Sequence, residues 1–238
     1  VVGDFDAGGL SEYLFSTAQG LRVRRGEDGL SDTGGWSYTF TTLEIESVAS
    51  LDVTGDFIDD LLIGVPEETS GDVAAGYVGL IPGGLSEGQL LQLEQTTNGV
   101  GLNPGIAVGF SDSVERANFG TAVCGVGDLN NDGFGDFIGT APAMTREFPG
   151  EARLYLGRPM ETFLDQAAGQ PLPRGTETTR FLAAEPGTGF GVVGECSALW
   201  PNPGDTQPYL FLGASQDPLG GDGDEGAVFY FRNDALAR

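Results

Sequence analysis

The sequence contains no histidine and no lysine, and its 11 basic residues are all arginines. Histidine is the most common general base and transition-metal ligand, so its absence argues against triad hydrolases and zinc sites. The 35 acidic residues give a net charge of -24. Such a surface lacks the basic footprint that nucleic acids need and is repelled by anionic membranes. It favours divalent cations or a medium of high salt.

Cysteine and long apolar segments are also scarce. The two cysteines, Cys124 and Cys196, are too few for a disulfide framework. They are either buried free thiols or one disulfide between neighbouring units of a secreted protein. No apolar run reaches the length of a membrane span, so we expect no membrane insertion. The sequence starts at Val1 inside a motif and without a signal peptide, so we expect a processed product or a fragment.

Glycine, in contrast, is abundant. The 238 residues include 40 glycines and 13 prolines, and 39% of the residues are hydrophobic. A chain of this composition can form a core, and its many turn residues indicate short strands joined by tight turns. We therefore predict an all-β protein.

One segment carries a regular pattern of oxygen-bearing side chains. Residues 128–136 have them at the first, third, fifth and ninth positions, as Asp128, Asn130, Asp132 and Asp136. Ca²⁺ prefers about six to eight oxygen ligands in flexible geometry. An EF-hand loop begins in the same way but needs a glutamate at position 12, where this sequence has Gly139. The pattern predicts a calcium loop that leads into a strand, and the alternative is a metal-free turn.

The same spacing recurs elsewhere in the chain with increasing loss of ligands. Residues 52–60 keep Asp52, Thr54, Asp56 and Asp60, residues 4–12 keep Asp4, Asp6 and Glu12, and residues 201–209 keep only Asp205. We predict Ca²⁺ sites in loops 128–136 and 52–60, with the carbonyls of Phe134 and Ile58 as additional ligands. Loop 4–12 leaves a third site open, and we predict that loop 201–209 binds no metal.

The strands around these loops repeat as well. Each loop is followed by an apolar run, at 13–18, 61–66, 137–142 and 210–215. A second strand then begins at or next to a glycine, at 20–23, 76–81, 151–156 and 226–231. Strands that lead into the loops are predicted at 43–51, 119–124 and 190–194. Each unit thus reads as a four-stranded antiparallel meander, with repeats at about 1–42, 43–110, 111–183 and 184–238 of one domain, 1–238.

Such a sheet cannot bury both of its faces alone, so neighbouring units must stack. Radial stacking of four-stranded antiparallel sheets gives a β-propeller, which we predict. A β-sandwich is the alternative, but its strands do not repeat a loop motif at regular spacing. The four units either close a ring alone or form part of a larger ring that a second chain completes.

The third unit resembles a known repeat family. Phe119-Gly120, the loop from Gly127 to Asp136, Ala141-Pro142 and the strand with Leu154-Tyr155 are similar to the FG-GAP repeat of the integrin α-subunit β-propeller and its bacterial or archaeal relatives. The resemblance implies Ca²⁺ in the first hairpin loop of a blade, an extracellular or cell-surface location, and a role in adhesion or in binding proteins or carbohydrates.

These observations favour a non-catalytic calcium-binding β-propeller module for adhesion, protein–protein interaction or surface assembly. Its partners would be a protein or glycan at the cell surface, or a second copy of the chain. Two alternatives remain, a lectin-like carbohydrate-binding propeller and the accessory propeller of a secreted enzyme. Catalysis within the chain is disfavoured because it has no histidine and because its carboxylates are committed to metal.

Overall fold

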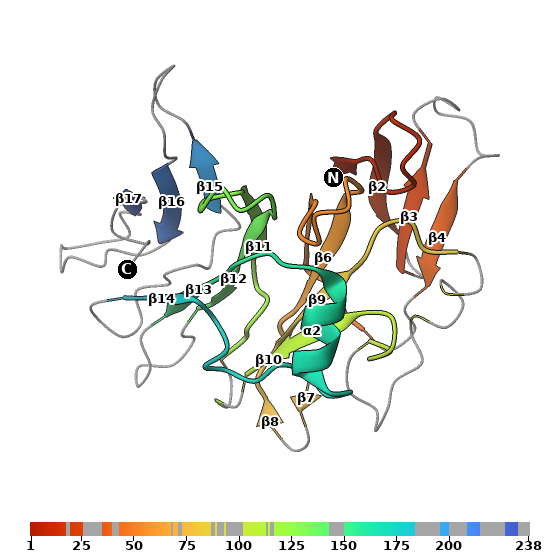
Figure 1. Cartoon of the computed structure of the whole chain (residues 1–238). Coiled ribbons are helices and arrows are strands. Elements are labelled where there is room, and N and C mark those ends of the chain that lie inside the picture. The colour runs from red at the N-terminus through yellow and green to blue at the C-terminus, as the bar shows by residue number, and fades with distance from the viewer. Residues whose placement is uncertain are drawn as a thin grey trace.

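The computed structural model describes residues 1–17, 20–25, 35–39, 43–67, 69–70, 73–86, 89, 93, 102–112, 114, 117–142, 150–183, 196–199, 209–214 and 227–232. Within these residues the protein is almost entirely β-structure (Figure 1). No described helix is both long enough and apolar enough to cross a membrane.

Four antiparallel sheets follow one another along the chain, and in each one the strands pair in sequence order. The first sheet contains β1 (Val2–Gly3), β2 (Glu12–Thr17), β3 (Gly20–Arg24) and β4 (Trp36–Thr39). The second contains β5 (Ser47–Leu51), β6 (Asp60–Val65), β9 (Tyr77–Ile81) and β10 (Val108–Ser111). The third contains β11 (Val123–Gly127), β12 (Asp136–Ala141), β13 (Glu151–Tyr155) and β14 (Thr179–Leu182). The fourth contains β15 (Cys196–Leu199), β16 (Tyr209–Ala214) and β17 (Ala227–Arg232).

The predicted meanders are confirmed in these sheets. Each strand that follows an acidic loop, and each glycine-led strand, lies within one residue of its predicted bounds. Antiparallel strands with both faces covered are expected to be apolar throughout. Accordingly, every residue of β6, β9, β12 and β13 is buried.

The prediction of a strand at 119–124 is wrong, because β11 starts at Val123. Phe119 instead forms a bridge with Gly76, which joins the second and third sheets ahead of the strand. Gly120 has a φ of 96°, and a Cβ atom there would lie 2.3 Å from the Tyr77 carbonyl oxygen. The Phe-Gly pair is therefore a tight inter-sheet contact rather than part of a strand. The strand predicted at 190–194 lies outside the described residues.

Neighbouring sheets pack face to face through three separate cores. The first core includes Leu14 of the first sheet and Ile63 of the second. The second core joins Leu62 of the second sheet to Phe137 of the third, and the third core joins Ile138 to residues of the fourth sheet. The first strands of successive sheets also lie side by side, β1 by β5, β5 by β11 and β11 by β15. The sheets therefore form a series, with β2–β4 and β15–β17 on opposite sides of Figure 1.

Two smaller elements interrupt the meanders. Strands β7 (Thr69–Ser70) and β8 (Val73–Ala74) pair with each other between β6 and β9. Helix α2 (Met160–Ala167) lies between β13 and β14 and was not predicted from the sequence. It packs Phe163 and Ala167 into the second core, beside Phe110 of β10. The helix thus covers part of the junction between the second and third sheets.

Candidate metal sites in the first hairpin loops

Loops 4–12, 52–60 and 128–136 share one backbone conformation. Each joins the first strand of its sheet to the second and has a positive φ at its fourth and sixth positions. These residues are Ala7 and Gly9, then Gly55 and Phe57, then Asn131 and Gly133. Residues other than glycine rarely adopt this conformation, so its recurrence shows that the three loops are structural repeats.

The carboxylates at the ends of these loops hold the shared conformation. At the first position, Asp4, Asp52 and Asp128 each accept a hydrogen bond from the sixth backbone N–H, at 2.9, 2.9 and 2.8 Å. At the ninth position, Glu12, Asp60 and Asp136 each accept one from the second backbone N–H, at 2.8 Å. The acidic residues of the pattern therefore organise the loop backbone as well as bringing oxygen atoms together.

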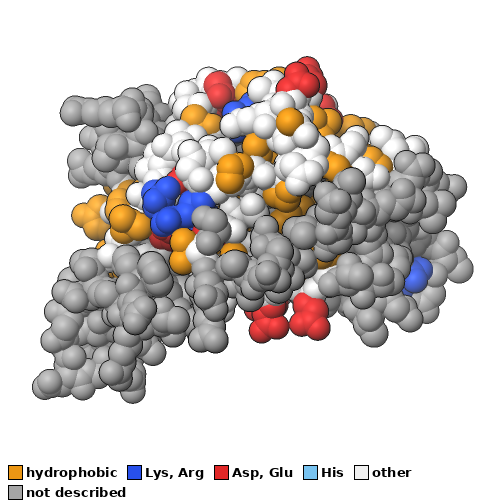
Figure 2. Space-filling model, turned by 90° about the horizontal axis from the view of Figure 1, so that it is seen from below, with side chains coloured by type: hydrophobic (Ala, Val, Ile, Leu, Met, Phe, Trp, Pro, Cys, Tyr) orange, Lys and Arg blue, Asp and Glu red, His pale blue; other side chains and the backbone are white. Residues whose placement is uncertain are grey.

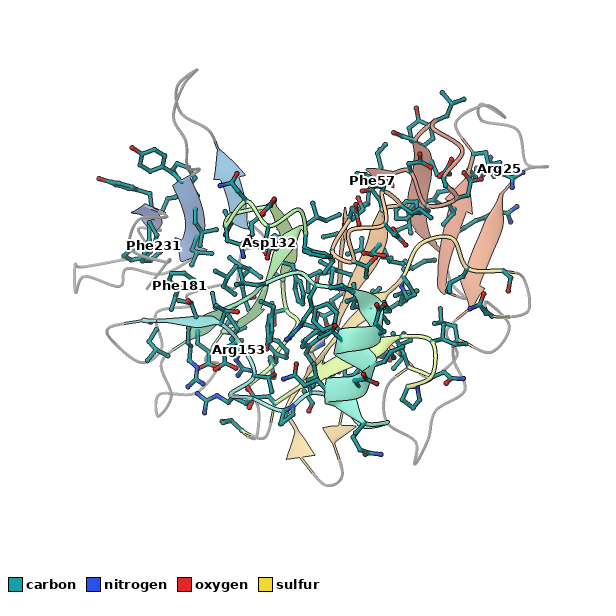
Figure 3. The ribbon with its side chains drawn as sticks, viewed as in Figure 1. Arg25, Phe57, Asp132, Arg153, Phe181 and Phe231 are labelled. Carbon is teal, nitrogen blue, oxygen red and sulfur yellow. The ribbon has the colours of Figure 1, made fainter. Side chains whose placement is uncertain are left out.

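The three loops form a row along one edge of the protein. The Asp59 N–H donates to the Asp4 carbonyl at 2.8 Å, and the Gly135 N–H donates to the Asp52 carbonyl at 2.8 Å. Figure 3 shows Phe57 and Asp132 of two adjacent loops at the upper edge of the sheets. The row places the candidate ligands of all three loops on the same side of the molecule.

Loop 4–12 has the geometry that best suits a hard cation. Carboxylate oxygens of Asp4, Asp6 and Glu12 lie within 4.8 Å of one another, and no other described group of acidic residues meets this criterion. Asp4 Oδ1 is buried without a hydrogen-bond partner among the described residues. Burial, together with the charges of Asp6 and Asp4, raises the pKa of Glu12. The residues present therefore fit a cation, although Arg25 Nε already donates to Asp6 Oδ2 at 3.1 Å.

Loops 52–60 and 128–136 hold their last carboxylate differently. Asp60 also accepts a hydrogen bond from the Gly83 N–H at 3.0 Å, and Asp136 accepts one from the Gly157 N–H at 2.9 Å. Burial raises the pKa of Asp60 to about 7 and that of Asp136 to about 6. These side chains anchor each loop to the segment that follows the third strand of its sheet, and a cation near them would oppose the cost of their burial.

The remaining predicted ligands lie within the same loops. Thr54 Oγ1 donates to Asp60 at 3.3 Å, and Asn130 Nδ2 donates to Asp132 at 2.8 Å. Asp56 and Asp132 each accept a hydrogen bond from the backbone N–H two residues later, which belongs to Ile58 and Phe134. Ligation by the carbonyls of Ile58 and Phe134 stays a prediction, and loop 201–208 lies outside the described residues.

Phe57 occupies the sixth loop position, where the two sister loops have glycine. Its φ is 67° and its side chain is 92% exposed, so no packing offsets the backbone strain. We expect Phe57→Gly to raise the free energy of unfolding by about 0.5–1 kcal/mol, measured by denaturant titration. The change Ile58→Gly, next to it, is the matched control and is expected to destabilise. A loss of stability in Phe57→Gly would contradict the assignment of strain.

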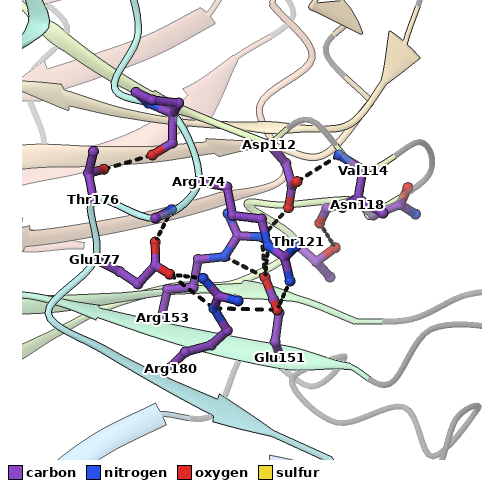
Figure 4. Close-up of polar contacts among 12 residues, drawn as sticks. Asp112, Val114, Asn118, Thr121, Glu151, Arg153, Arg174, Thr176, Glu177 and Arg180 are labelled. Atoms are coloured by element: carbon purple, nitrogen blue, oxygen red, sulfur yellow. Dashed lines mark hydrogen bonds and ion pairs between the residues drawn. The ribbon is translucent and has the colours of Figure 1, made fainter.

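A buried charge network lies away from the loops and was missed by the sequence analysis. Arg153 of β13 donates to Asp112, which follows β10, and to Glu151 (Figure 4). Arg174 and Arg180 also form ion pairs with Glu151. Figure 2 shows a compact patch of basic side chains on the face seen from below. Burial would raise the pKa of Glu151, but hydrogen bonds and charges from Arg174 and Arg153 hold it below its ordinary value. The sequence signal for this network is Arg153, a charged residue within the otherwise mostly apolar strand β13.

The cysteine alternatives are resolved for Cys124 of β11. Cys124 is disulfide-bonded, and the described chain has no free cysteine. The sequence contains just one other cysteine, Cys196, at the start of β15. Because β11 and β15 are adjacent first strands, the bond links the third and fourth sheets.

Comparison with known proteins agrees with this architecture. The family described as FG-GAP repeat matches residues 45–81, which contain β5, loop 52–60, β6 and β9. Integrin alpha-PS2 of Drosophila melanogaster is 34% identical over 121 residues, which cover 48% of this chain and 8% of that protein. The matched region thus spans under a tenth of this relative's length. Residues 45–81 thus match an FG-GAP repeat, and about half of the chain is similar to part of an integrin α subunit.

Proposed function

We propose that the chain is a calcium-stabilised, non-catalytic β-propeller module that binds other proteins outside the cell. The four sheets follow one another as blades do, with their first strands adjacent and a core between each pair. This arrangement supports radial stacking about an axis along the first strands. The family relationship supports an interaction role, because the relative named above is an integrin subunit.

The observation that carries the calcium proposal is the acidic group of loop 4–12 on a backbone that recurs twice. Asp4, Asp6 and Glu12 would hold one ion, and the unpartnered Asp4 Oδ1 would gain a ligand bond. The equivalent sites would use Asp52, Thr54, Asp56 and Asp60, and Asp128, Asn130, Asp132 and Asp136. Bound Ca²⁺ would supply positive charge that offsets the repulsion within each loop. The residues themselves fix the hairpin that begins each sheet.

An oxidising location is supported by the disulfide of Cys124. Disulfides persist in secreted proteins and are rare in reducing compartments. This observation supports a location outside the cell and is independent of the acidic loops.

The calcium proposal predicts a change in thermal stability. With dissociation constants on the order of 10⁻⁴ to 10⁻³ M, about 10 mM Ca²⁺ adds about 1.4–2.7 kcal/mol for each site. We expect calorimetry to show a higher melting temperature in Ca²⁺ than in EDTA. Asp4→Asn with Asp6→Asn should remove part of the gain, whereas Asp165→Asn, on the exposed side of α2, should leave it intact. Equal melting temperatures in Ca²⁺ and EDTA would rule out structural calcium.

A further inference from the structure

The segment that follows the third strand of the third sheet contacts two acidic loops at once. The Gly157 N–H donates to Asp136 Oδ1, at the ninth position of the loop in its own sheet, at 2.9 Å. The next amide, the Arg158 N–H, donates to the carbonyl of Val53 at 3.1 Å. Val53 is the second residue of the loop in the preceding sheet. Two consecutive backbone amides therefore hold the last carboxylate of one loop and the start of the loop before it.

The second sheet repeats this link toward the first sheet. The Gly83 N–H donates to Asp60 Oδ1 at 3.0 Å, and the Gly84 N–H donates to the Phe5 carbonyl at 2.8 Å. These acceptors are again the ninth position of one loop and the second position of the preceding loop. Because the link occurs at two separate junctions, it is a property of the repeat and not of one pair of loops.

Gly157 fills the space between loops 52–60 and 128–136. A Cβ atom at Gly157 would lie 2.4 Å from the Gly135 carbonyl oxygen of the later loop and 2.7 Å from the Val53 carbonyl oxygen of the earlier one. The φ of Gly157 is not positive, so the close approach of the two loops, and not the backbone conformation, requires a glycine here. The two loops are thus packed against the same residue.

Two further contacts join these loops directly. The Gly135 N–H donates at 2.8 Å to the carbonyl of Asp52, the first residue of the earlier loop. The Phe134 ring packs on Gly55, where a Cβ atom would lie 2.5 Å from Phe134 Cε1. Phe134 and Gly135 come immediately before Asp136 in the sequence. An ion that fixes the end of the later loop therefore also fixes the surface on which the earlier loop packs.

We propose that loops 52–60 and 128–136 bind Ca²⁺ cooperatively, with Gly157 and the Phe134 side chain as the residues that couple them. The inference rests on the proposed calcium function and describes how these same sites are regulated. When one loop has been ordered by its ion, the other loses less conformational entropy on binding a second ion. Linkage makes the effect reciprocal, so a single coupling factor describes it.

Electrostatics acts against this cooperativity, because the first ion reduces the attraction for the second. Residues 52–60 contain four aspartates and residues 128–136 contain three, so one Ca²⁺ leaves either loop negative when its carboxylates are ionised. An occupied loop therefore still attracts a second ion next to it. The Debye length falls from about 8 Å at 0.15 M salt to about 3 Å at 1 M. The coupling factor should therefore be no smaller in 1 M NaCl than in 0.15 M.

Calorimetric titration with Ca²⁺ measures the coupling factor. All chains would carry Asp4→Asn and Asp6→Asn, which leaves two sites. Asp56→Asn and Asp132→Asn each remove one exposed carboxylate from one of these and keep an acceptor for the backbone N–H two residues later. The two variants give the two single-site constants. We expect the overall constant of the two-site chain to exceed their product about fivefold or more.

Two variants test the route of the coupling. Gly157→Ala inserts a methyl group between the loops, and Phe134→Ala removes the ring that lies on Gly55 without removing a carboxylate. Each should bring the coupling factor close to one while both loops still bind Ca²⁺. Gly105→Ala is the matched control, because a Cβ atom there would meet only Asn103 Oδ1, at 3.4 Å, and it should leave the factor unchanged.

The outcomes separate this inference from the calcium function itself. Binding of two ions with a factor near one would overturn cooperativity and leave the calcium function intact. A large factor that persists in both Gly157→Ala and Phe134→Ala would overturn the route through these residues. A chain that binds no Ca²⁺ at either loop would overturn the proposed calcium function, and the inference with it.

Discussion

Arg153→Met is expected to lower the free energy of unfolding by about 3–5 kcal/mol. The Arg153 side chain is fully buried, as is that of Asp112, and the side chain of Glu151 is 6% exposed. Removing the guanidinium takes away the positive charge that Arg153 places against the buried Asp112 carboxylate, and weaker compensation of a buried charge is costly. Glu151 keeps Arg174 and Arg180 as partners, so most of the loss should arise at Asp112. Denaturant titration measures the change.

A double variant separates lost charge pairing from lost packing. Asp112→Asn removes the buried negative charge but keeps an acceptor for the Val114 N–H, which donates to Asp112 at 2.8 Å. Arg153→Met with Asp112→Asn should therefore be more stable than Arg153→Met alone. Arg174→Met is the matched control, because its side chain is 31% exposed and such pairs contribute about 1 kcal/mol or less. Similar losses in Arg153→Met and Arg174→Met would show that the network does not depend on burial.

The network also shows why the Phe-Gly pair is needed between the second and third sheets. The Arg153 guanidinium carbon lies 4.4 Å from the centroid of the Phe119 ring, whose side chain is fully buried. Phe119 reaches this position because Gly76 and Gly120 allow the two backbones to approach closely. The pair therefore contributes an aromatic surface for a buried cation, and the two features hold the same inter-sheet junction.

The meander architecture was predictable because its signals are local and repeated. The order of the strands could be predicted without knowledge of tertiary contacts. Buried and less buried residues alternate in β3, β6 and β12 are mostly apolar, and the loop pattern occurs in four copies. Helix α2 was not predicted, although its sequence carries a readable helix signal. Pro159 precedes it, Glu161 lies in its first turn, and Phe163 and Ala167 are spaced four apart on its buried side.

The candidate site was predictable in composition but not in detail. The acidic spacing identified the loops, yet the anchoring of Asp60 and Asp136 depends on Gly83 and Gly157, about 20 residues further along the chain. A pattern within nine residues does not contain such contacts. The conformation of Phe57 could not be predicted from its residue type either. Its positive φ is the one that Gly9 and Gly133 adopt at the same loop position, and phenylalanine by itself disfavours it.

Loss of the disulfide at Cys124 is expected to have the second large effect. For cysteines about 70 residues apart, cross-linking the unfolded chain is worth about 4 kcal/mol in the loop-entropy description. The bond ties the fourth sheet, which has three strands, to β11 of the third. Reduction should therefore release the fourth sheet first, and hydrogen exchange should quicken in β16 and β17 before it does in β6 or β12.

Cys124→Ala provides the comparison for chemical reduction. Measured in reductant, the variant and the wild-type chain should differ only by the small change in packing at a side chain that is 7% exposed. Without reductant, the wild-type chain should be more stable by several kcal/mol, and the variant should not respond to reductant. Retained protection in β16 and β17 after reduction would mean that Leu210, Leu212 and the third core hold the sheet without the covalent link. In that case the bond would serve chiefly to restrict the unfolded chain.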